Sequence, residues 1–374
     1  MDDRLRVAVT LEQCWHRVPG GTARSALESV DALLAHGQVD LVGVSARHRS
    51  DPEPAWRTSL EVRSFQLPRV ALYESWHRLR RPSVSRLVGG ADVIHATGMA
   101  VPPPTTALVV TVHDLAFMRD PSHFSARGVR FFHRAIELAR RDATLVMCPS
   151  EATIAECIDA GFDSDRLRLV PWSVEPMAVN PTQISAVRRS LRIDGPMVLW
   201  AGTIEPRKNL PVLLDAFRQL EDQTATLVLA GPQGWNEDIS AKLHSLGERV
   251  RVVGFLPADE LRVLQTAADI FCFPSLQEGF GLPVLEAMAQ GTAVVTSAGT
   301  ATAEVGGDAA VLIDPLDSAA LAVALDALLA DPSTRAALAA AGLERSVSAY
   351  SRQSHALALG SVYSEAAERW GRSS

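Results

Sequence analysis

The chain has 374 residues, a formal net charge of −7, and 47% hydrophobic and 21% charged residues. This composition is typical of a globular protein that is long enough for two hydrophobic cores, and it lacks the basic excess of a nucleic-acid-binding protein. No apolar run approaches the about 20 residues that span a bilayer. The start MDDRLRVAVT does not look like a signal peptide, so we expect a cytoplasmic protein.

The cysteines are scattered and form no CxxC pair, which predicts buried free thiols and neither disulfides nor a zinc site. They are Cys14, Cys148, Cys157 and Cys272.

The first half of the chain alternates apolar runs with helical patterns, which predicts a parallel sheet covered by helices. The predicted strands are 5–11, 39–44, 92–96, 107–112, 144–149 and 166–171, with an edge strand within 51–67 and helices at about 23–35, at 127–141 and from about 152. A loop with Gly20, Gly21 and Thr22 lies between the first strand and helix. Its spacing is not GxGxxG, which disfavours a nicotinamide dehydrogenase. Ser150 fits the N-cap of the helix that follows it.

Residues 73–87 (YESWHRLRRPSVSRL) are basic with interspersed apolar side chains. Two interpretations stay open for this segment. It is either a solvated helix broken at Pro82 or a peripheral contact with anionic lipid headgroups.

Two polar elements in this half differ in their position. His113 and Asp114 directly follow a predicted buried strand, where α/β proteins place site residues, whereas His95 and His133 fit structural roles. The only DxD sequence of the chain, residues 163–165, lies in a polar connector. We interpret it as a solvated turn, which removes the case for a catalytic metal.

The second half repeats the alternation. Predicted strands lie at 196–200, 225–230, 250–253, 268–273, 293–296 and 309–314, and helices at 185–191, 210–220, 318–329, 334–347 and 353–370. The pattern predicts an α/β fold with two doubly wound domains. We place the N-terminal domain at 1–172, a linker at 173–194, the C-terminal domain at 195–350, and at 351–374 a helix that packs back toward the N-terminal domain.

The loop GTIEPRKN at 202–209 follows the first strand of the second half. Arg207 and Lys208 would suit a diphosphate leaving group, although two adjacent cations are also typical of a solvated loop. Only two lysines occur in the chain, Lys208 and Lys242, so position 208 indicates a preference for a compact ammonium. Asn209 is predicted to cap the next helix.

The stretch PSLQEGFGLPVLEAMA at 274–289 runs from a buried strand through a Gly-Phe-Gly turn into a helix. Strand, glycine loop and helix N-terminus form an anion site at the carboxyl edge of a parallel sheet. Glu278 precedes the turn, and Glu286 lies about one helical turn beyond it. Alone, two glutamates near a helix start would only favour the helix dipole.

The pattern Glu278, seven residues, Glu286 resembles the signature of retaining glycosyltransferases of family 4, and the loop 202–209 resembles a second signature of that family. The segment HDLAFMRDPSHFS at 113–125 resembles the His-Asp element of its mannosyltransferases. The resemblance implies the GT-B architecture, in which two Rossmann-like domains face each other across a cleft.

By this resemblance, Arg207 and Lys208 hold the diphosphate, Glu278 and His113 contact the transferred sugar, and Asp114 orients nearby groups or the acceptor. These first four are the expected catalytic residues. The expected donor-binding residues are Gly20, Gly21, Gly202, Phe280, Gly281, Leu282 and Glu286, the last through the ribose hydroxyls.

The resemblance implies a retaining, metal-independent enzyme without a cofactor that transfers a hexose from a nucleotide-diphosphate sugar. GDP-mannose is favoured over UDP-glucose and UDP-N-acetylglucosamine. The acceptor is a glycan, a glycolipid or a small molecule, and the enzyme is cytoplasmic with a possible peripheral contact on the inner face of the plasma membrane. A GT-B sugar-nucleotide epimerase and a non-catalytic sugar-nucleotide-binding protein remain alternatives.

Overall fold

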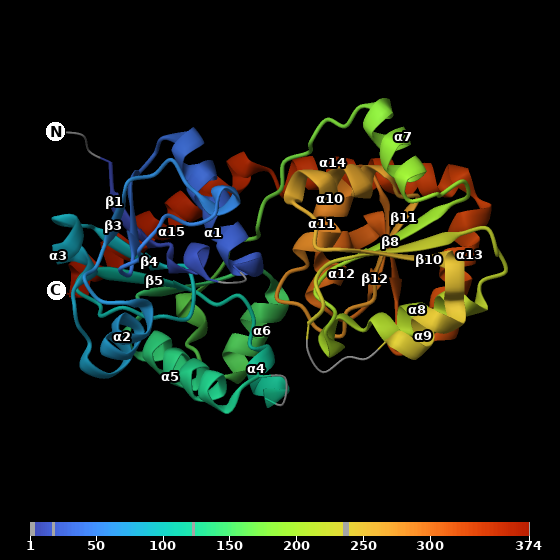
Figure 1. Ribbon diagram of the computed structural model, residues 1–374. Coiled ribbons are helices and arrows are strands. Elements are labelled where there is room, and N and C mark those ends of the chain that lie inside the picture. Colours follow the sequence, from blue (N-terminus) through green and yellow to red (C-terminus); the bar gives the residue numbers. More distant parts are fainter. Residues whose placement is uncertain (1–3, 17–18, 122–123, 235–238, 374) are drawn as a thin grey trace. The chain divides into compact units, whose positions relative to one another are not determined.

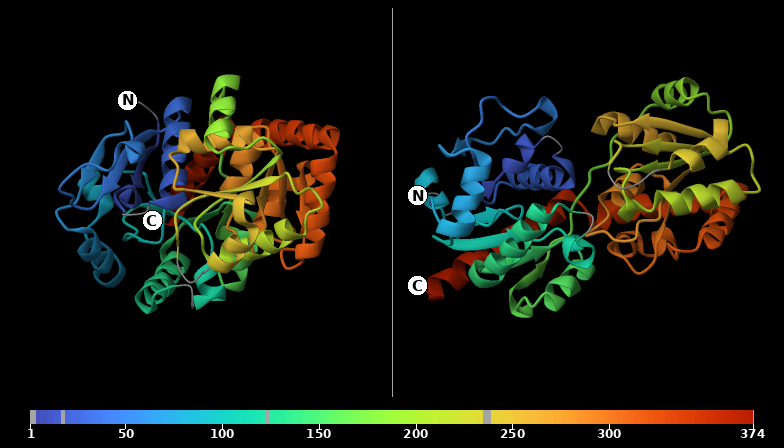
Figure 2. Two further views of the ribbon diagram at one scale, coloured as in Figure 1. Left: turned by 45° about the vertical axis from the view of Figure 1, so that its right-hand side comes forward. Right: turned by 60° about the horizontal axis from the view of Figure 1, so that its bottom comes forward.

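The computed structural model describes residues 4–16, 19–121, 124–234 and 239–373 (Figure 1). The chain forms two compact units, Met1–Ser173 with Arg352–Ser374, and Val174–Ser351. In each unit helices cover both faces of a parallel sheet (Figures 1 and 2). The predicted α/β fold with two doubly wound units is confirmed.

The first unit contains a seven-stranded sheet in the order β3-β2-β1-β4-β5-β6-β7. The strands are β1 (Arg6–Thr10), β2 (Asp40–Ser45), β3 (Val62–Ser64), β4 (Val93–Ala96), β5 (Ala107–Thr111), β6 (Leu145–Cys148) and β7 (Leu167–Leu169). Val9 pairs in parallel with Gly43 on one side and His95 on the other. The order reverses between β1 and β4, which makes this edge a topological switch point.

Side chains alternate between two cores, one on each face of this sheet. On β1, Val7 and Val9 join one buried cluster and Ala8 joins the other. This period of two, with both faces apolar, is what a strand buried on both sides requires. The helices of the unit are α1 (Gly20–His36), α2 (Arg69–Glu74), α3 (Val84–Val88), α4 (Ala116–Arg119), α5 (Ala126–Asp142), α6 (Glu151–Asp159) and α15 (Arg352–Ser373).

The second unit contains a six-stranded sheet in the order β10-β9-β8-β11-β12-β13. The strands are β8 (Met197–Ala201), β9 (Thr226–Ala230), β10 (Val250–Gly254), β11 (Ile270–Phe273), β12 (Ala293–Ser297) and β13 (Ala310–Ile313). Here the order reverses between β8 and β11. The helices are α7 (Pro181–Ser190), α8 (Leu210–Gln219), α9 (Ser240–Leu246), α10 (Ala258–Ala267), α11 (Leu282–Ala289), α12 (Ala301–Gly306), α13 (Ser318–Ala330) and α14 (Pro332–Ala349).

Short helical turns complete both units: η1 (Glu12–Trp15), η2 (Pro54–Trp56), η3 (Ser75–Leu79), η5 (Ser164–Arg166), η6 (Pro206–Lys208), η7 (Gly247–Arg249) and η8 (Gly307–Ala309). The polar turn at 163–165 is exposed, and Asp163 Oδ1 accepts from Asp165 N at 3.1 Å. Ser150 caps α6 as predicted, by accepting from Thr153 N at 3.0 Å. All four cysteines are free and buried, in agreement with the sequence analysis.

The segment 73–87 folds inward. Trp76 is 2% exposed and donates from Nε1 to Pro82 O at 3.0 Å, and Val84 is fully buried. Leu79 alone of its large aliphatic side chains is strongly exposed, at 61%. The apolar side chains that a lipid contact would use are therefore mostly part of the core. Among the described residues, no helix is both long enough and apolar enough to cross a membrane.

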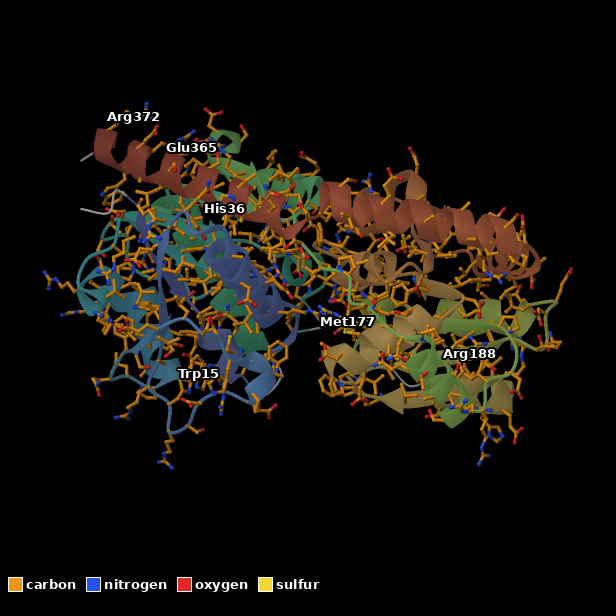
Figure 3. The ribbon with its side chains drawn as sticks, turned by 90° about the horizontal axis from the view of Figure 1, so that it is seen from above. Trp15, His36, Met177, Arg188, Glu365 and Arg372 are labelled. Atoms are coloured by element: carbon orange, nitrogen blue, oxygen red, sulfur yellow. The ribbon has the colours of Figure 1, made fainter. Side chains whose placement is uncertain are left out.

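The C-terminal helix α15 packs on the first unit, beside α1. Tyr363 OH lies 2.8 Å from His95 Nδ1 in the core of that unit, and Glu365, labelled in Figure 3, accepts from Arg168 Nε at 2.7 Å. The stretch before β8 belongs to the second unit: on α7, Arg188 donates to Ala267 O at 2.9 Å.

We predict that neutral buried histidines make the first unit sensitive to acid. Burial lowers the pKa of His95 to about 3 and that of His355 to about 4, below the value of about 6.5 in an unfolded chain. The unfolded state therefore binds more protons in this range. Stability is fully present above pH about 6.5 and is lost as the pH falls toward 4.

Replacing His355 by Gln should reduce the slope of the free energy of unfolding against pH by about 1.4 kcal/mol per pH unit in this range. The measurement is urea unfolding at a series of pH values. His133→Gln is the matched control, because His133 is exposed on α5. Equal slopes in wild type and His355→Gln would contradict the prediction.

Candidate active site

The loops that follow β8 and β11 meet at the switch point of the second sheet. Arg207 O accepts two hydrogen bonds from the loop after β11, from Ser275 Oγ and from Leu276 N, both at 2.9 Å. These bonds join two loops that lie far apart in the sequence. Because parallel strands present their carboxyl ends at one edge, this is where a ligand site is expected.

Asn209 stabilises this junction in a way that the sequence analysis did not predict. It stands before α8, but its side chain caps no amide of that helix. Its backbone is left-handed, with φ of 53°, and its Nδ2 donates to Pro274 O at 3.0 Å and to Pro315 O at 2.6 Å. The N-cap prediction is therefore wrong for the side chain, which instead ties together the loops after β11 and β13.

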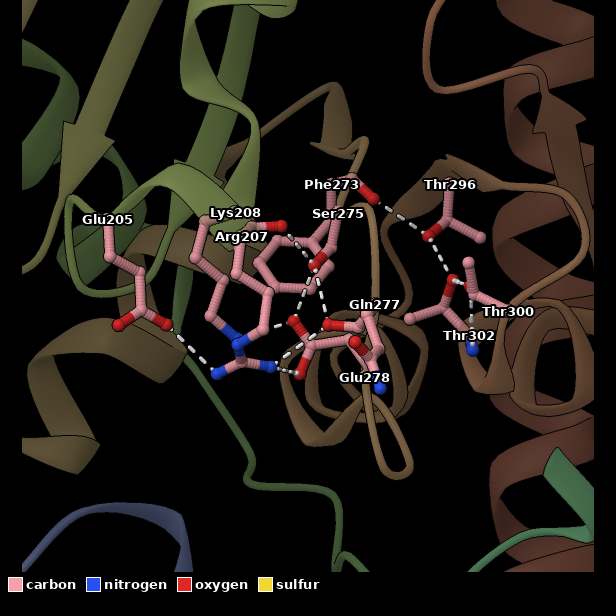
Figure 4. A network of polar contacts seen from close by, with 10 residues as sticks. All are labelled: Glu205, Arg207, Lys208, Phe273, Ser275, Gln277, Glu278, Thr296, Thr300 and Thr302. Carbon is pink, nitrogen blue, oxygen red and sulfur yellow. Dashed lines mark hydrogen bonds and ion pairs between the residues drawn. The ribbon is translucent and has the colours of Figure 1, made fainter. Parts of the chain in front are cut away.

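A charge cluster occupies the junction (Figure 4). The carboxylate of Glu278 accepts from Arg207 Nη1 at 2.9 Å and from Lys208 Nζ at 2.5 Å. Ser275 Oγ donates to the same carboxylate at 2.6 Å, and Arg207 Nη2 donates to Glu205 Oε1 at 2.9 Å. Three of the four expected catalytic residues thus contact one another directly.

Burial sets the electrostatics of the cluster. The side chains of Lys208 and Glu278 are 10% and 9% exposed. Burial alone would raise the pKa of Glu278, but Arg207, Lys208 and the hydrogen bonds to its carboxylate lower it to about 2. Burial and the adjacent Arg207 lower the pKa of Lys208, while Glu278 opposes that shift. Glu278 is therefore a carboxylate throughout the physiological range and has no proton to donate.

Helix α11 begins directly beside this cluster. Gly281, before its first residue Leu282, has φ of 107°, and a Cβ there would lie 2.8 Å from Thr302 Cγ2. Thr302 is fixed by hydrogen bonds with Thr296 and Thr300 at 2.9 and 2.7 Å. Position 281 therefore requires glycine, and the N-terminus of α11 follows it directly.

The remaining expected donor residues of this unit have structural contacts. Glu286 is buried on α11, at 5% exposure, and Phe280 packs edge-on against Tyr350 with a centroid distance of 5.7 Å. A Cβ on Gly202 would meet only ordinary contacts. Gly231, which the sequence analysis did not single out, needs glycine more strongly: its φ is 142°, and a Cβ would lie 1.8 Å from Gly202 O. The Gly-Pro pair after β9 was the available signal.

His113 and Asp114 belong to the first unit, just after β5. His113 Nε2 donates to Thr97 O at 2.8 Å, and its ring stacks on Trp172 with centroids 5.4 Å apart. Burial lowers the pKa of His113, so the ring is neutral at pH 7 and Nδ1 is left as an acceptor. Asp114 Oδ1 accepts from Ala116 N at 3.0 Å, which gives it a structural role at the start of α4.

Gly20 and Gly21 are the first two residues of α1 and are exposed. The sequence analysis placed them in a loop before the helix. A Cβ on either would meet nothing within 4 Å, but Gly20 has φ of 64°, which favours glycine at that position. Within the described residues, no group of three or more His, Cys, Asp or Glu side chains is arranged to hold a metal ion.

Comparison with known proteins agrees with this architecture. HepE from Anabaena, solved in complex with UDP and glucose, superposes with a TM-score of 0.77 over 96% of this chain and 100% of that chain, at 21% identity. WaaG, a glycosyltransferase involved in lipopolysaccharide biosynthesis, gives a TM-score of 0.70 over 91% and 95% at 18% identity. The fold is therefore that of the GT-B glycosyltransferases.

Family models cover nearly the whole chain. Residues 19–176 match Glycosyltransferase Family 4, and residues 184–345 match glycosyl transferases group 1. O-antigen chain mannosyltransferase B of Escherichia coli is 31% identical over 261 residues, 67% of this chain and 68% of that protein. MMP alpha-(1->4)-mannosyltransferase of Mycolicibacterium hassiacum is 30% identical over 304 residues, 75% and 72%. The chain belongs to glycosyltransferase family 4.

We predict that the buried ion pair of Lys208 and Glu278 stabilises the second unit far more than an exposed ion pair does. Glu278→Gln should lower the free energy of unfolding by about 3 kcal/mol or more, because it leaves two neighbouring cations with less compensating charge. Lys208→Met should lower the free energy of unfolding by less than Glu278→Gln does, because Arg207 still neutralises the carboxylate of Glu278. Urea unfolding of both variants and of the double variant measures the coupling energy.

The control is the second lysine, whose Nζ lies 2.5 Å from Asp215 Oδ2 but whose side chain is 39% exposed. Lys242→Met should change stability by about 0–1 kcal/mol. A coupling energy for Lys208 and Glu278 no larger than that of the exposed pair would show that the cluster does not contribute in this way.

Proposed function

We propose that the protein is a retaining, metal-independent glycosyltransferase that moves a hexose, mannose favoured, from a nucleotide-diphosphate sugar to an acceptor hydroxyl. The observation that carries the proposal is the cluster of Arg207, Lys208 and Glu278 beside the start of α11, at the switch point of its sheet. Two cations beside the N-terminus of a helix, at one point of the sheet, suit a diphosphate.

The cluster has capacity for a further anion. Lys208 Nζ has three donors, and within the described part of the chain its one hydrogen bond goes to Glu278. In the proposed complex the remaining donors bind the diphosphate, whose negative charge grows as the bond to the sugar breaks. Pre-positioned cations stabilise that charge without reorganisation.

Glu278 and His113 then act on the sugar as acceptors of hydrogen bonds. Glu278 is ionised, with a pKa of about 2, and His113 uses its Nε2 proton for Thr97 O. Neither group is a proton donor at neutral pH. We propose that the acceptor oxygen attacks the anomeric carbon from the leaving-group face, that the bond to the diphosphate breaks, and that a diphosphate oxygen takes the acceptor proton. The configuration is retained.

The relatives support different donors. Two similar proteins are named as mannosyltransferases, which favours GDP-mannose. HepE, by contrast, was solved with UDP-glucose and is similar to this chain in fold. We propose GDP-mannose first, with a UDP-sugar as the competing donor, and a glycan, glycolipid or small-molecule acceptor. Similar proteins named as transferases make the epimerase and the non-catalytic alternatives less favoured.

We predict that a nucleoside diphosphate stabilises the protein and that EDTA does not abolish the effect. A ligand at about 100 times its dissociation constant adds about 2.7 kcal/mol, which gives a measurable rise in melting temperature. The panel is GDP, UDP, ADP and NAD, each with and without EDTA. A shift with GDP alone would favour the mannose donor. A shift with NAD alone, or with none of the four, would overturn the proposal.

We further predict that Glu278→Ala and Lys208→Ala abolish sugar transfer while the variants remain folded. The matched control, Lys242→Ala, removes the other lysine and should keep wild-type activity. Transfer is followed by the appearance of glycosylated product, whose anomeric configuration is determined by NMR. Wild-type rates in either site variant would refute the site, and an inverted product would refute the retaining mechanism alone.

A further inference from the structure

The chain passes from the first unit to the second between Ser173 and Val174, and returns between Ser351 and Arg352. The second-last residue before each passage is aromatic and at least nine-tenths buried. Trp172 is 6% exposed, and Tyr350 is 9% exposed. Each ring contacts the part of its own unit to which the proposed function assigns a role.

Trp172 packs between two imidazoles. It stacks on His113 with centroids 5.4 Å apart and an interplanar angle of 29°, and it meets His355 edge-on at 5.6 Å. His355 is itself fixed, because its Nδ1 donates to Pro171 O at 2.8 Å and its Nε2 lies 2.9 Å from Ser29 Oγ. Trp172 is therefore held in place by His355, and it restricts the movement of the His113 ring that stacks on it.

Tyr350 has the corresponding place in the second unit. Its ring contacts Phe280 edge-on, with centroids 5.7 Å apart. Phe280 lies two residues after Glu278 and directly before Gly281. The hydroxyl of Tyr350 donates to Glu304 O at 3.2 Å, and the guanidinium of Arg345 lies over the ring at 5.7 Å. Its carbonyl accepts from Val174 N at 3.3 Å, the first residue after the outward passage.

Both contacts are needed on physical grounds. Among the described residues, His113 has one hydrogen bond, to Thr97 O, and a single bond leaves the imidazole free to tilt about it. Gly281 is packed against Thr302, whereas the ring of Phe280 before it makes no hydrogen bond and packs on Tyr350. In each case the aromatic ring removes the freedom that the hydrogen bonds leave.

We propose that Trp172 and Tyr350 are positioning residues for sugar transfer. Trp172 holds the ring of His113, and Tyr350 holds Phe280 and with it the turn between Glu278 and the start of α11. This inference rests on the proposed function. Both residues act through another side chain, and any change in the backbone at either passage reaches the reacting groups through one aromatic contact.

The test compares Trp172→Leu with Trp172→Phe, and Tyr350→Leu with Tyr350→Phe. In Trp172→Leu, kcat should fall about tenfold or more, because small misplacements of reacting groups carry large costs in rate, while nucleoside diphosphate affinity stays near wild type. In Tyr350→Leu, both kcat and nucleotide affinity should fall. The Phe variants keep a ring at each position and should restore most of the activity.

A spectroscopic measurement separates positioning from loss of stability. In wild type, the nitrogen NMR signals of His113 should show one neutral tautomer with the proton on Nε2, and in Trp172→Leu they should broaden or average. Trp76→Leu and Phe217→Leu remove buried aromatic residues elsewhere in the two units and serve as controls matched for melting temperature.

The outcomes are distinguishable. Loss of kcat in the Leu variants no larger than in the matched controls, with an unchanged His113 tautomer, would overturn the positioning roles. If wild type transfers no sugar from any donor, the proposed function fails. The His113 signals and the nucleotide affinity of Tyr350→Leu then still decide the positioning roles, and unchanged values refute them. If Trp172→Leu does not fold, Trp172→Met, which fills much of the space without a ring, takes its place in the same comparison.

Discussion

The ion pairs of the Glu278 carboxylate with Arg207 and Lys208 are the interactions on which the geometry of the second unit's candidate site depends. The partners of Glu278 lie about 70 residues away in the chain, and they meet only because β8 and β11 are neighbours in the sheet. The hydrogen bonds from Ser275 and Leu276 to Arg207 O fix the two loops to each other. A parallel sheet whose order reverses at this point is therefore a precondition for the charge cluster.

This cluster compensates the positive charge of two adjacent, largely buried side chains. Two adjacent cations in a buried loop repel each other and lose hydration, which the lowered pKa of Lys208 reflects. Glu278 and Glu205 supply the compensating charge. Under the proposed function, a bound diphosphate would contribute further negative charge and allow Glu278 to turn its carboxylate oxygens toward sugar hydroxyls. The residue that neutralises the cations would then also be the residue that orients the sugar.

The sequence predicted the elements that local patterns determine. Buried strands and long amphipathic helices are periodic, so the alternation of both units and the N-cap at Ser150 were accessible from residues alone. Short helices such as α9 and α12 were missed, since six or seven residues carry little periodicity. The family resemblance pointed to Arg207, Lys208 and Glu278, and the structure adds that their side chains are mutual partners. Their catalytic roles stay predictions.

What the sequence could not predict depends on contacts between distant segments. Asn209 is a residue type that often caps helices, but its side chain donates hydrogen bonds to two carbonyls from other loops. Residues 73–87 have the composition of a surface helix, but Trp76 and Val84 are taken into the core. Trp172 and Tyr350 carry no local signal at all, because their significance lies in the rings that they touch.

This division has a consequence for how relatives with the same motifs can differ. In the proposed function, charged and glycine residues of the motifs supply the chemistry, and their geometry is set by neighbours outside the motifs. Position 281 requires glycine because Thr302 stands close to it, and the ring of Phe280 packs on Tyr350. A substitution at such a neighbour can therefore shift a motif side chain slightly although the motif sequence itself is unchanged. Rate is sensitive to displacements of this size, whereas the fold is not.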